Sequence, residues 1–458
     1  MRRMLLLTVL LMVSAAGFAA ENFPRPEFTQ GEVLPPTTTP PPRAEIFSLV
    51  DVAVLGLMLA LAAYFSLRQR SRANLVLLAL LGLVYFGFYR HGCVCAIGAI
   101  QNVGYALGGN GYALPLVVGL FFALPLLFAL FFGRVFCAGV CPLGAAQEVV
   151  LLKRVKVPTW LDSTLSMLPF IYGGVAVLYA VTGSAFLICR YDPFIPFFRL
   201  GGTDLMLGIG VGVLLLSVFV GRPYCRYLCP LSALLRLAAP LSKWRPQITR
   251  HECINCHLCA DSCPYGAIRP PTPSGEKYNR RAARRSLGWQ LLLIPLFIGI
   301  GGGLLRLSSP MLARVDYRVR LAETLWLQEQ GGASQTTAPP PMLEAYDNRE
   351  LPYALAYQRA IAIQKWFDTG AWALGGWIGL LFGLKLVGLM LRRRRETYSI
   401  DPGACVACGR CYSVCPLERS EALLIDSRAG GPPADAGEPP ALPEQRQAGE
   451  PTDVALGS

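Results

Sequence analysis

The sequence predicts a mainly α-helical, polytopic membrane protein, with about seven membrane helices after a signal peptide and a small α+β domain assembled from two separated segments. Three observations support this fold class. Of the 458 residues, 53% are hydrophobic and the mean hydropathy is +0.43, whereas soluble domains have about 45–50% apolar residues. Long apolar runs alternate with short basic ones. The fifteen cysteines are clustered, which favours metal ligation over a disulfide framework.

Both ends of the chain are predicted to lie outside the folded part. Residues 1–20 have a basic start, an apolar stretch, and small residues at Gly17 and Ala19, as a signal peptide has; an uncleaved anchor is the alternative. Residues 21–45 are rich in Pro and Thr, which predicts an extended periplasmic linker. Residues 426–458 are rich in Pro, Ala, Gly and Glu and are predicted to be disordered.

Seven apolar segments have, or nearly have, the roughly 20 residues with which a helix crosses a hydrocarbon core of about 30 Å. The first five form a predicted membrane domain over residues 46–245. The last two enclose residues 307–369, a predicted periplasmic segment with two amphipathic helices, YRVRLAETLWLQEQ and YALAYQRAIAIQKWF. The seven segments lie near 46–66, 73–90, 112–133, 164–187, 203–220, 286–306 and 370–391.

Positive charges predict the orientation of these helices. Counting from a periplasmic linker, the connections assigned to the cytoplasm hold most of the Lys and Arg residues, including Arg134, Lys153 and the run RRRR at 392–395. The net charge of +13 is thereby explained by topology, and no nucleic-acid partner is expected. The predicted location is the bacterial cytoplasmic (inner) membrane, with residues 307–369 and the linker in the periplasm.

Two cysteine motifs predict the α+β domain. CINCHLCADSCP at 253–264 and CVACGRCYSVCP at 405–416 share the spacing C-x2-C-x2-C-x3-C-P, the ligand spacing of bacterial ferredoxins, in which the fourth cysteine of each run binds the other cluster. The halves are predicted at 246–280 and 396–425, both cytoplasmic. Zinc is the alternative, but it usually takes two separated pairs of ligands. One [4Fe–4S] cluster is assigned to Cys253, Cys256, Cys259 and Cys415, and the other to Cys405, Cys408, Cys411 and Cys263.

The other seven cysteines each follow a predicted membrane helix. Cys95 and Cys141 begin the same frame, C-(A/P)-(I/L)-G-A-x-Q-(N/E)-V, and a weaker copy begins at Cys229. The topology places four of the seven at the inner face and three at the outer face, about one helix length apart. Four thiolates suffice for an iron–sulfur cluster. Cys137, Cys141, Cys225 and Cys229 are therefore a candidate inner-face cluster site, and Cys93, Cys95 and Cys189 with His91 are a candidate outer-face metal site.

Simpler interpretations of these corners stay open. Buried cysteine is common as a small apolar residue, and two outer cysteines can form a disulfide in an oxidising compartment. Histidine replaces thiolate in Rieske centres, but His91 also fits an ordinary position at the end of a helix.

On FCAGVCPLGAAQE at 136–148, YCRYLCPLSAL at 224–234 and the two ferredoxin motifs, the chain resembles the NosR/NapH-type membrane polyferredoxins over roughly residues 45–420. The resemblance implies electron transfer between a quinol or cytoplasmic reductant and a periplasmic redox protein. Residues 21–45 are too short for the flavin domain of the NosR branch, so no covalent flavin is expected, and a separate flavin-domain protein is an expected partner.

These observations together predict an electron carrier rather than a stand-alone catalyst, with two [4Fe–4S] clusters, one or two further clusters at the corners, and no catalytic residue. The first alternative is a quinol dehydrogenase subunit of a respiratory reductase system. Glu148, Asp162 and Asp192 lie near interfaces as candidate proton-releasing groups, although each also fits a solvated or capping acid. The second alternative is a redox sensor or assembly factor, which the lack of a recognisable output domain after the second motif disfavours.

Overall fold

The computed structural model of the chain describes residues 44–92, 95–109, 111–153, 155–201, 203–248, 253–272, 280–330, 353–390, 395 and 397–416. Contacts divide the chain into two units, Met1–Glu45 and Ile46–Ser458, and the second unit contains the cysteine motifs and the helices that surround them. The predicted signal peptide, the linker up to residue 43, the C-terminal tail and Cys93 lie outside the described residues.

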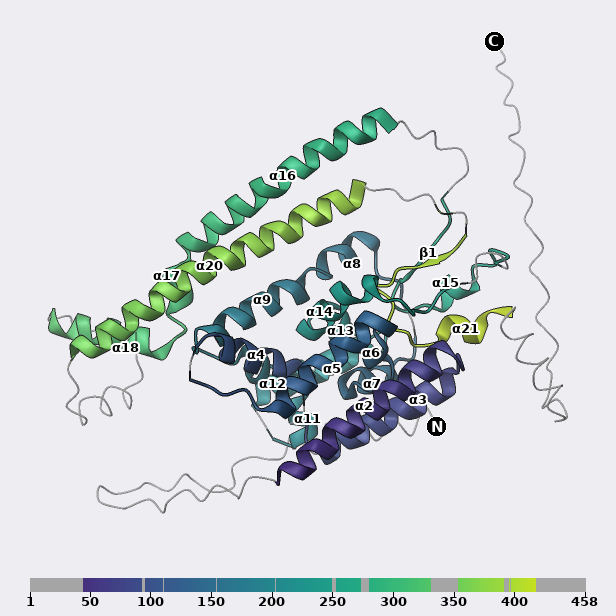
Figure 1. Cartoon of the computed structure of the whole chain (residues 1–458), viewed down its shortest axis with the longest axis horizontal. Coiled ribbons are helices and arrows are strands. Elements are labelled where there is room, and N and C mark those ends of the chain that lie inside the picture. The colour runs from purple at the N-terminus through teal and green to yellow at the C-terminus, as the bar shows by residue number, and fades with distance from the viewer. Residues whose placement is uncertain are drawn as a thin grey trace, which may run out of the picture. The chain divides into compact units, whose positions relative to one another are not determined.

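Each of the seven predicted apolar segments contains a helix (Figure 1). The second continues from an α-helix into a π-helix, η1, which ends just before His91. The fourth is divided between α8 and α9, because Pro169 stands at the start of α9. The helices are α2 (Glu45–Leu67), α3 (Arg72–Gly82), η1 (Leu83–Tyr89), α5 (Leu116–Phe132), α8 (Thr159–Leu165), α9 (Leu168–Val181), α12 (Asp204–Ser217), α16 (Arg280–Leu307) and α20 (Tyr353–Met390).

Four helices in the described part of the chain are long and apolar enough to cross a membrane: Glu45–Leu67, Arg72–Tyr89, Thr159–Val181 and Tyr353–Gly388. Four further apolar helices are shorter: Leu116–Phe132, Asp204–Ser217, Pro230–Leu241 and Leu291–Leu307. The chain is therefore a helical membrane protein. The count of seven crossings stays a prediction, because several of the predicted segments form helices below the length that a crossing needs.

Short helices at the cysteine corners fill the centre of the helical domain. Cys95, Cys141 and Cys229 are the N-cap residues of α4 (Ala96–Leu107), α7 (Pro142–Val149) and α14 (Pro230–Ala238), and all three have an extended backbone. The three copies of the sequence frame thus share one local structure. The other short helices here are α6 (Val135–Gly139), α10 (Leu187–Arg190), α11 (Ile195–Arg199), α13 (Pro223–Tyr227) and the 3-10 helix η2 (Ala239–Leu241).

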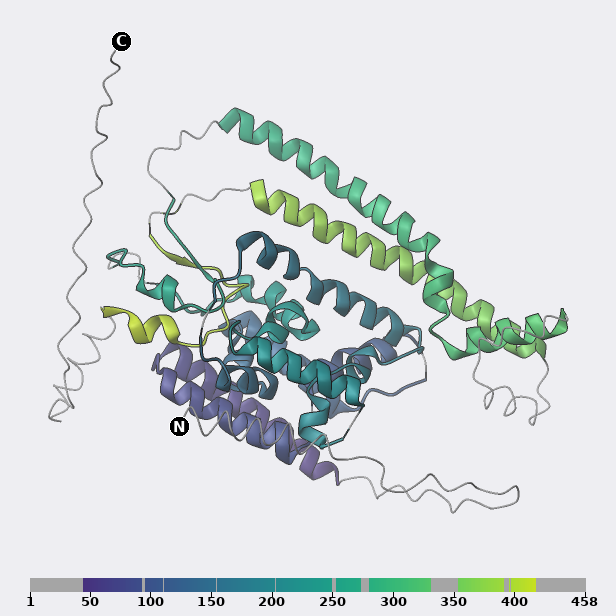
Figure 2. The same ribbon diagram turned by 180° about the vertical axis from the view of Figure 1, so that it is seen from behind.

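The last two long helices, α16 and α20, lie side by side (Figures 1 and 2). Glycines make this packing possible, because a Cβ atom at Gly375 or Gly379 would collide with the backbone of α16. α17 (Ser309–Ala313) and α18 (Tyr317–Glu329) pack on α20. The second amphipathic helix predicted in the periplasmic segment is not a separate element: no proline interrupts the chain between Tyr353 and Met390, so it is continuous with the last membrane helix.

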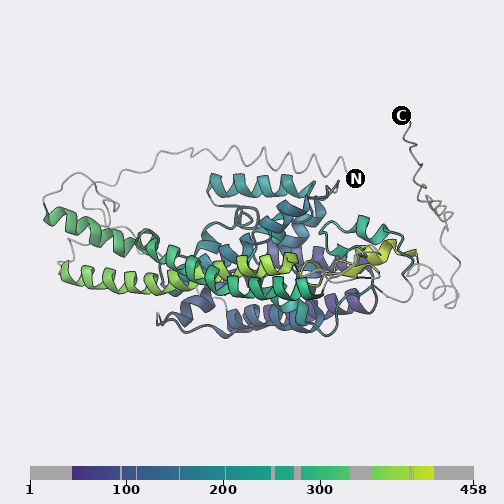
Figure 3. The same ribbon diagram turned by 90° about the horizontal axis from the view of Figure 1, so that it is seen from above.

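The two ferredoxin segments lie together although 141 residues separate Cys263 from Cys405. Strand β1 (Ile268–Arg269) pairs antiparallel with β2 (Ser399–Ile400). The short helices α15 (Leu258–Ser262) and α21 (Arg410–Val414) contact each other (Figure 3). The cysteines of both motifs therefore share one small domain.

Candidate iron–sulfur sites

The ferredoxin segments enclose two hollows, each lined by cysteines from both segments. The first has Cys263, from the earlier segment, opposite three cysteines of the later one. The second has three cysteines of the earlier segment opposite Cys415. The cysteines are Cys263, Cys405, Cys408 and Cys411 in the first hollow, and Cys253, Cys256, Cys259 and Cys415, with Cys411 at the edge, in the second.

These hollows fit clusters better than single ions. Among the described residues, no group of three or more His, Cys, Asp or Glu side chains closes around one point as the ligands of a single metal ion do. A cubane cluster instead needs its thiols spaced around a cavity, one at each iron corner. Both hollows have four thiols in their walls in the combination that the motif spacing predicts.

The four candidate inner-face cysteines gather in the core of the helical domain. All are buried, with 5–6% of their surface exposed. The thiols of Cys141 and Cys225 hydrogen-bond each other, and Cys137 and Cys229 interact electrostatically with Cys225. We call Cys137, Cys141, Cys225 and Cys229 the quartet.

Buried polar side chains surround the quartet. The Arg134 guanidinium lies 3.9 Å from Cys137 Sγ and donates to Ser232 Oγ at 2.6 Å. Gln147 Nε2 donates to Cys225 Sγ at 3.3 Å, and its Oε1 accepts from the Tyr224 backbone N–H at 3.0 Å. Because hydrogen bonds to sulfur and nearby charge tune iron–sulfur centres, these residues are suited to stabilise thiolates bound to a cluster.

Glu148 joins the ferredoxin segments to the quartet. This carboxylate, whose side chain is 11% exposed, pairs with Arg222 at 3.2 Å and with Arg410, accepts from Tyr265 Oη at 2.7 Å, and lies 3.5 Å from Arg72. Burial alone would raise the pKa of Glu148, but the positive charges of Arg222 and Arg410 outweigh it and lower the pKa to about 2. The carboxylate is therefore ionised at neutral pH.

Arg222 extends this network to both thiol sets. It donates to the Cys137 backbone carbonyl and interacts electrostatically with Cys225 of the quartet and with Cys408 of the ferredoxin. Two more contacts hold the same surfaces together: Arg134 donates to the Gly403 carbonyl at 3.0 Å, and Ser66 Oγ to the Ala407 carbonyl at 3.1 Å. The ferredoxin is thus docked beside the quartet.

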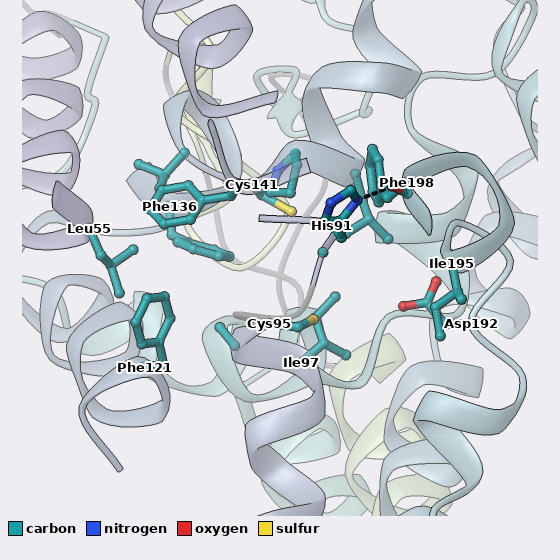
Figure 4. Close-up of a pocket in the computed structure, with 16 residues that line it drawn as sticks. Leu55, His91, Cys95, Ile97, Phe121, Phe136, Cys141, Asp192, Ile195 and Phe198 are labelled. Atoms are coloured by element: carbon teal, nitrogen blue, oxygen red, sulfur yellow. Dashed lines mark hydrogen bonds between the residues drawn. The ribbon is translucent and has the colours of Figure 1, made fainter. Parts of the chain in front are cut away.

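The candidate outer-face cysteines lie closer to the quartet than the sequence predicted. Cys95 and Cys141 line the same cavity (Figure 4), so the two corners are not separated by the full thickness of a membrane. The physical reason is that α4 and α7 follow their cysteines back into the core, where Ala96, Ile97, Leu143 and Ala145 are buried. A cysteine after a predicted helix end therefore need not lie at a membrane face.

The cavity also holds two polar groups named from the sequence. His91 lines it, but Nδ1 of His91 lies 3.2 Å from the Phe198 carbonyl oxygen, so that nitrogen has a partner. Asp192 lines it as well, and burial raises the pKa of Asp192 to about 6, against the opposing effects of the Phe194 N–H and Arg199. Asp162 instead pairs with Arg226 at 2.7 Å and accepts from Tyr227 at 2.9 Å.

Several residues around these sites were not found by sequence reasoning. Gln147 stands in the repeated frame, which was a usable signal, whereas Arg222, Arg410 and Tyr265 carry no motif that would single them out. Glu148 was noted only as a candidate proton-releasing acid. Its ion pairs indicate a structural role, because Arg222 and Arg410 hold it ionised.

Two protein-family models cover the segments that contain the quartet and the ferredoxin motifs. Two family models described as "4Fe-4S binding domain" match the chain, one at residues 114–158 and 205–249 and the other at 246–269 and 398–418. The first pair of segments contains the quartet, and the second contains the ferredoxin motifs. Cys95 and Cys189 lie outside both matches.

Curated relatives point the same way. An uncharacterised protein of Methanocaldococcus jannaschii is 30% identical over 191 residues, which are 40% of this chain and 77% of that protein. The regulatory protein NosR of Pseudomonas aeruginosa is 30% identical over 248 residues, 48% of this chain and 34% of NosR. The putative electron transport protein YccM of Escherichia coli is 28% identical over 148 residues, 29% of this chain and 41% of YccM.

The chain thus spans less than half the length of NosR and of YccM. No solved structure matches it.

Proposed function

We propose that this chain, which belongs to the NosR/NapH-type family of membrane ferredoxins, passes electrons across the bacterial cytoplasmic membrane. Its iron–sulfur electron-transfer role is the starting point. The electrons pass between a quinol or cytoplasmic reductant and a periplasmic redox protein. The observation that carries this proposal is the position of Arg222, which interacts with Cys408 of the ferredoxin and with Cys225 of the quartet. One buried side chain thereby holds two thiol sets next to each other.

We assign the cysteines to clusters from the two ferredoxin hollows and from the quartet. Each ferredoxin hollow takes a [4Fe–4S] cluster, bound by the crossed ligand sets of the two motifs. The quartet supplies four thiolates for a third cluster. When bound, each cluster takes up or gives up one electron without breaking a bond.

The surrounding side chains have defined tasks in this proposal. Arg134 and Arg222 offset the negative charge of the quartet thiolates in the low-dielectric core. Gln147 orients α13, the short helix that carries Cys225, and donates to the Cys225 sulfur. Glu148 keeps the ferredoxin docked, so that the path between the two thiol sets stays short.

The sidedness and partners are also proposals. The ferredoxin motifs lie in the cytoplasm, and residues 21–45 and 307–369 lie in the periplasm, where α17 and α18 offer a surface to a redox protein or a separate flavin-domain protein. The positive-charge bias of the connections supports this orientation.

Iron content tests the cofactor part of the proposal. The full chain, purified and reconstituted anaerobically, is expected to bind about twelve iron atoms, four for each cluster. Cys408→Ser and Cys141→Ser should each remove a different EPR signal. A content of about eight iron atoms, with Cys141→Ser indistinguishable from wild type, would show that the quartet binds no cluster.

Proteoliposomes test the transfer itself. With ferricyanide enclosed and a membrane-impermeant reductant outside, the wild-type chain is expected to bleach the ferricyanide, and Cys141→Ser is expected to slow the bleaching at least tenfold. Glu323→Gln, which removes the ion pair with Arg314 near α18, is the matched control and should transfer at the wild-type rate. Bleaching no faster than in empty liposomes would overturn the proposal.

Quinol oxidation is a second candidate function, favoured by one observation. Asp192, one of the three acids named from the sequence, lines a cavity that is largely apolar and reaches Cys95 and Cys141. Reduction of the clusters by a quinol in liposomes, lost in Asp192→Asn, would support it. If a quinol does not reduce the clusters, quinol oxidation is contradicted and electron transfer remains the proposed function.

A further inference from the structure

We propose that a soluble one-electron carrier protein exchanges electrons with the ferredoxin at one of its two hollows, and that the electrons pass between this hollow and the quartet through the other one. The far hollow has Cys253, Cys256, Cys259 and Cys415 in its walls, and the near hollow has Cys263, Cys405, Cys408 and Cys411. This inference rests on the proposed function, to which it adds the order of the sites and the place where the carrier binds.

Two consecutive residues of α7 connect the quartet with the near hollow. Gln147 Nε2 donates to Cys225 Sγ at 3.3 Å. The carboxylate of Glu148 accepts from Arg410 Nε at 3.1 Å and from Tyr265 Oη at 2.7 Å, and both of these partners line the near hollow. The route from a quartet sulfur to the near hollow is therefore a continuous series of hydrogen bonds and covalent bonds.

A second connection starts at the residue after Cys263. The carbonyl of Pro264 accepts from Arg226 Nη1 at 3.2 Å, and Arg226 directly follows Cys225 in α13. A Cβ atom at Gly221, shortly before α13, would lie only 2.8 Å from Pro264 Cβ, so the two segments meet more closely than a side chain here allows. The segment that carries Cys263 of the near hollow therefore packs directly on the segment that carries Cys225 of the quartet.

The two hollows differ in how far their walls are exposed. In the near hollow, Val406 and Ala407 are 5% and 3% exposed, and the Ala407 carbonyl accepts from Ser66 Oγ of α2. In the wall of the far hollow, Ile254 is 57% exposed, and Leu258 of the same motif is 49% exposed. The near hollow is thus packed against the helical domain, whereas the far hollow lies beneath exposed apolar side chains of the kind that protein interfaces bury at their centre.

Every transfer in this order moves one electron and no atoms. When the carrier is the donor, it is oxidised by one electron, which passes by way of the far hollow, the near hollow and the quartet to the periplasmic redox protein, which is reduced. When the carrier is the acceptor, the same order is reversed. No bond forms or breaks and no proton moves, so the residues around the sites need only keep them close together and exclude water.

Two surface variants that lower the net charge by the same amount test where the carrier binds. Ile254→Glu adds a carboxylate at the far hollow, whereas Arg269→Gln removes a cation next to the near hollow, where Ile268 lines the wall. The ion pair of Arg269 with Asp401 is exposed, so its loss costs little stability. The full chain, loaded with iron anaerobically, is mixed with reduced flavodoxin, an acidic one-electron carrier, and bleaching of the clusters is followed by stopped flow.

Ile254→Glu should slow the reduction by flavodoxin about tenfold, because the carboxylate repels the acidic carrier where it binds. Arg269→Gln should be reduced at the wild-type rate. The methyl viologen radical, a small reductant that needs no docking surface, should reduce both variants as fast as the wild type, which shows that their clusters are intact.

Magnetic coupling between the reduced clusters, measured by EPR, tests the order of the sites. Cys256→Ser removes the cluster of the far hollow, and the remaining ferredoxin signal should still be split by the quartet signal, because magnetic coupling weakens steeply with distance. Cys408→Ser removes the cluster of the near hollow, and the quartet signal should then lose its splitting.

Three results would overturn the inference. The first is reduction of Ile254→Glu by flavodoxin at the wild-type rate, and the second is an equal or larger slowing in Arg269→Gln. The third is a quartet signal that is split in Cys408→Ser but not in Cys256→Ser. If a cysteine variant loses both ferredoxin clusters, the flavodoxin comparison decides. A chain without any quartet signal would contradict the third cluster of the proposed function, and the flavodoxin comparison would still decide which hollow the carrier meets.

Discussion

The quartet corner and the Cys95 corner begin with the same frame of residues, but only the quartet copy has a charged residue at the eighth position. Glu148 stands there in the quartet copy and pairs with Arg222 and Arg410, whereas Asn102 stands there in the other copy and donates to the Gly98 carbonyl at 3.5 Å. The frame therefore positions a cysteine and a glutamine in both corners. The eighth position contributes to this difference, because Glu148 joins the ferredoxin to the quartet, together with the contacts of Arg134 and Ser66.

The largest expected effect is that of Glu148→Gln. The substitution leaves Arg222 buried without its countercharge, which should lower the free energy of unfolding by about 3–5 kcal/mol and expose the ferredoxin to protease. Asn102→Ala, at the matched position, should change it by less than about 1 kcal/mol. Reversible unfolding in mixed micelles measures both, and equal effects would contradict the difference between the corners.

Acid titration tests the same ion pairs. The pKa of Glu148 is lowered from 4.5 to about 2, so its ion pairs contribute stability that is fully present above about pH 4.5 and is lost as the pH falls towards 2. In Glu148→Gln this part of the acid dependence should disappear. An unchanged acid limb would show that Glu148 is not paired in solution.

The carboxyl at the other corner should respond to pH in the opposite direction. The pKa of Asp192 is raised from 3.8 to about 6 by burial, so its contribution is most favourable below pH 3.8 and becomes unfavourable as the pH rises towards 6. Asp192→Asn retains an oxygen for the Phe194 N–H and should stabilise the protein by roughly 2–3 kcal/mol at pH 7. If Asp192→Asn stabilised the protein no more at pH 7 than at pH 4, the carboxyl would not be held in a buried site without an ion-pair partner.

A smaller contrast is expected at the glycine of each frame. An alanine Cβ at Gly144 would lie 3.1 Å from Arg222 Nη1 and 3.2 Å from the Cys137 carbonyl oxygen, which should cost about 1–3 kcal/mol. At Gly98 the nearest atom is 3.4 Å away, so Gly98→Ala should be neutral or stabilise by up to about 1 kcal/mol through helix propensity. Thermal unfolding midpoints decide this, and a larger loss at Gly98 than at Gly144 would reverse the expected order.

The smallest expected effect is that of Ser66→Ala, which removes the hydrogen bond to the Ala407 carbonyl of the ferredoxin. The free energy of unfolding is expected to fall by about 1 kcal/mol, and protease should cleave the ferredoxin faster. Ser308 is an exposed serine between α16 and α17 whose hydroxyl donates to the Leu304 carbonyl, and Ser308→Ala should leave both measurements within error. Equal cleavage rates would show that this contact does not hold the ferredoxin.

Much of the fold was predictable, because hydrophobic length and cysteine spacing are local signals. The seven apolar segments each contain a helix, and the helix from Tyr317 was found from its amphipathic pattern. The shared family and the iron–sulfur role also followed from the motifs. The continuation of α20 through Gly370 was missed, because one glycine in an apolar run does not stop a helix held by a neighbour.

The arrangement of the sites was less predictable, since it depends on contacts between distant segments. Successive helix ends suggested corners at opposite membrane faces, but α4 and α7 turn back into the core and bring Cys95 and Cys141 to one cavity. No local pattern in the sequence pairs Glu148 with Arg410, which are 262 positions apart. The frame did contain Gln101 and Gln147, but only their contacts show what they do.

The division of the ferredoxin by the α16–α20 hairpin has a consequence for biosynthesis. A ribosome makes Cys263 before the hairpin and Cys405 after it, and each ferredoxin hollow has walls from both segments. Neither hollow can be complete until α20 has been synthesised, because the second segment follows α20 in the chain. A chain that stalls before Cys405 therefore presents half-sites, with thiols from the first segment alone.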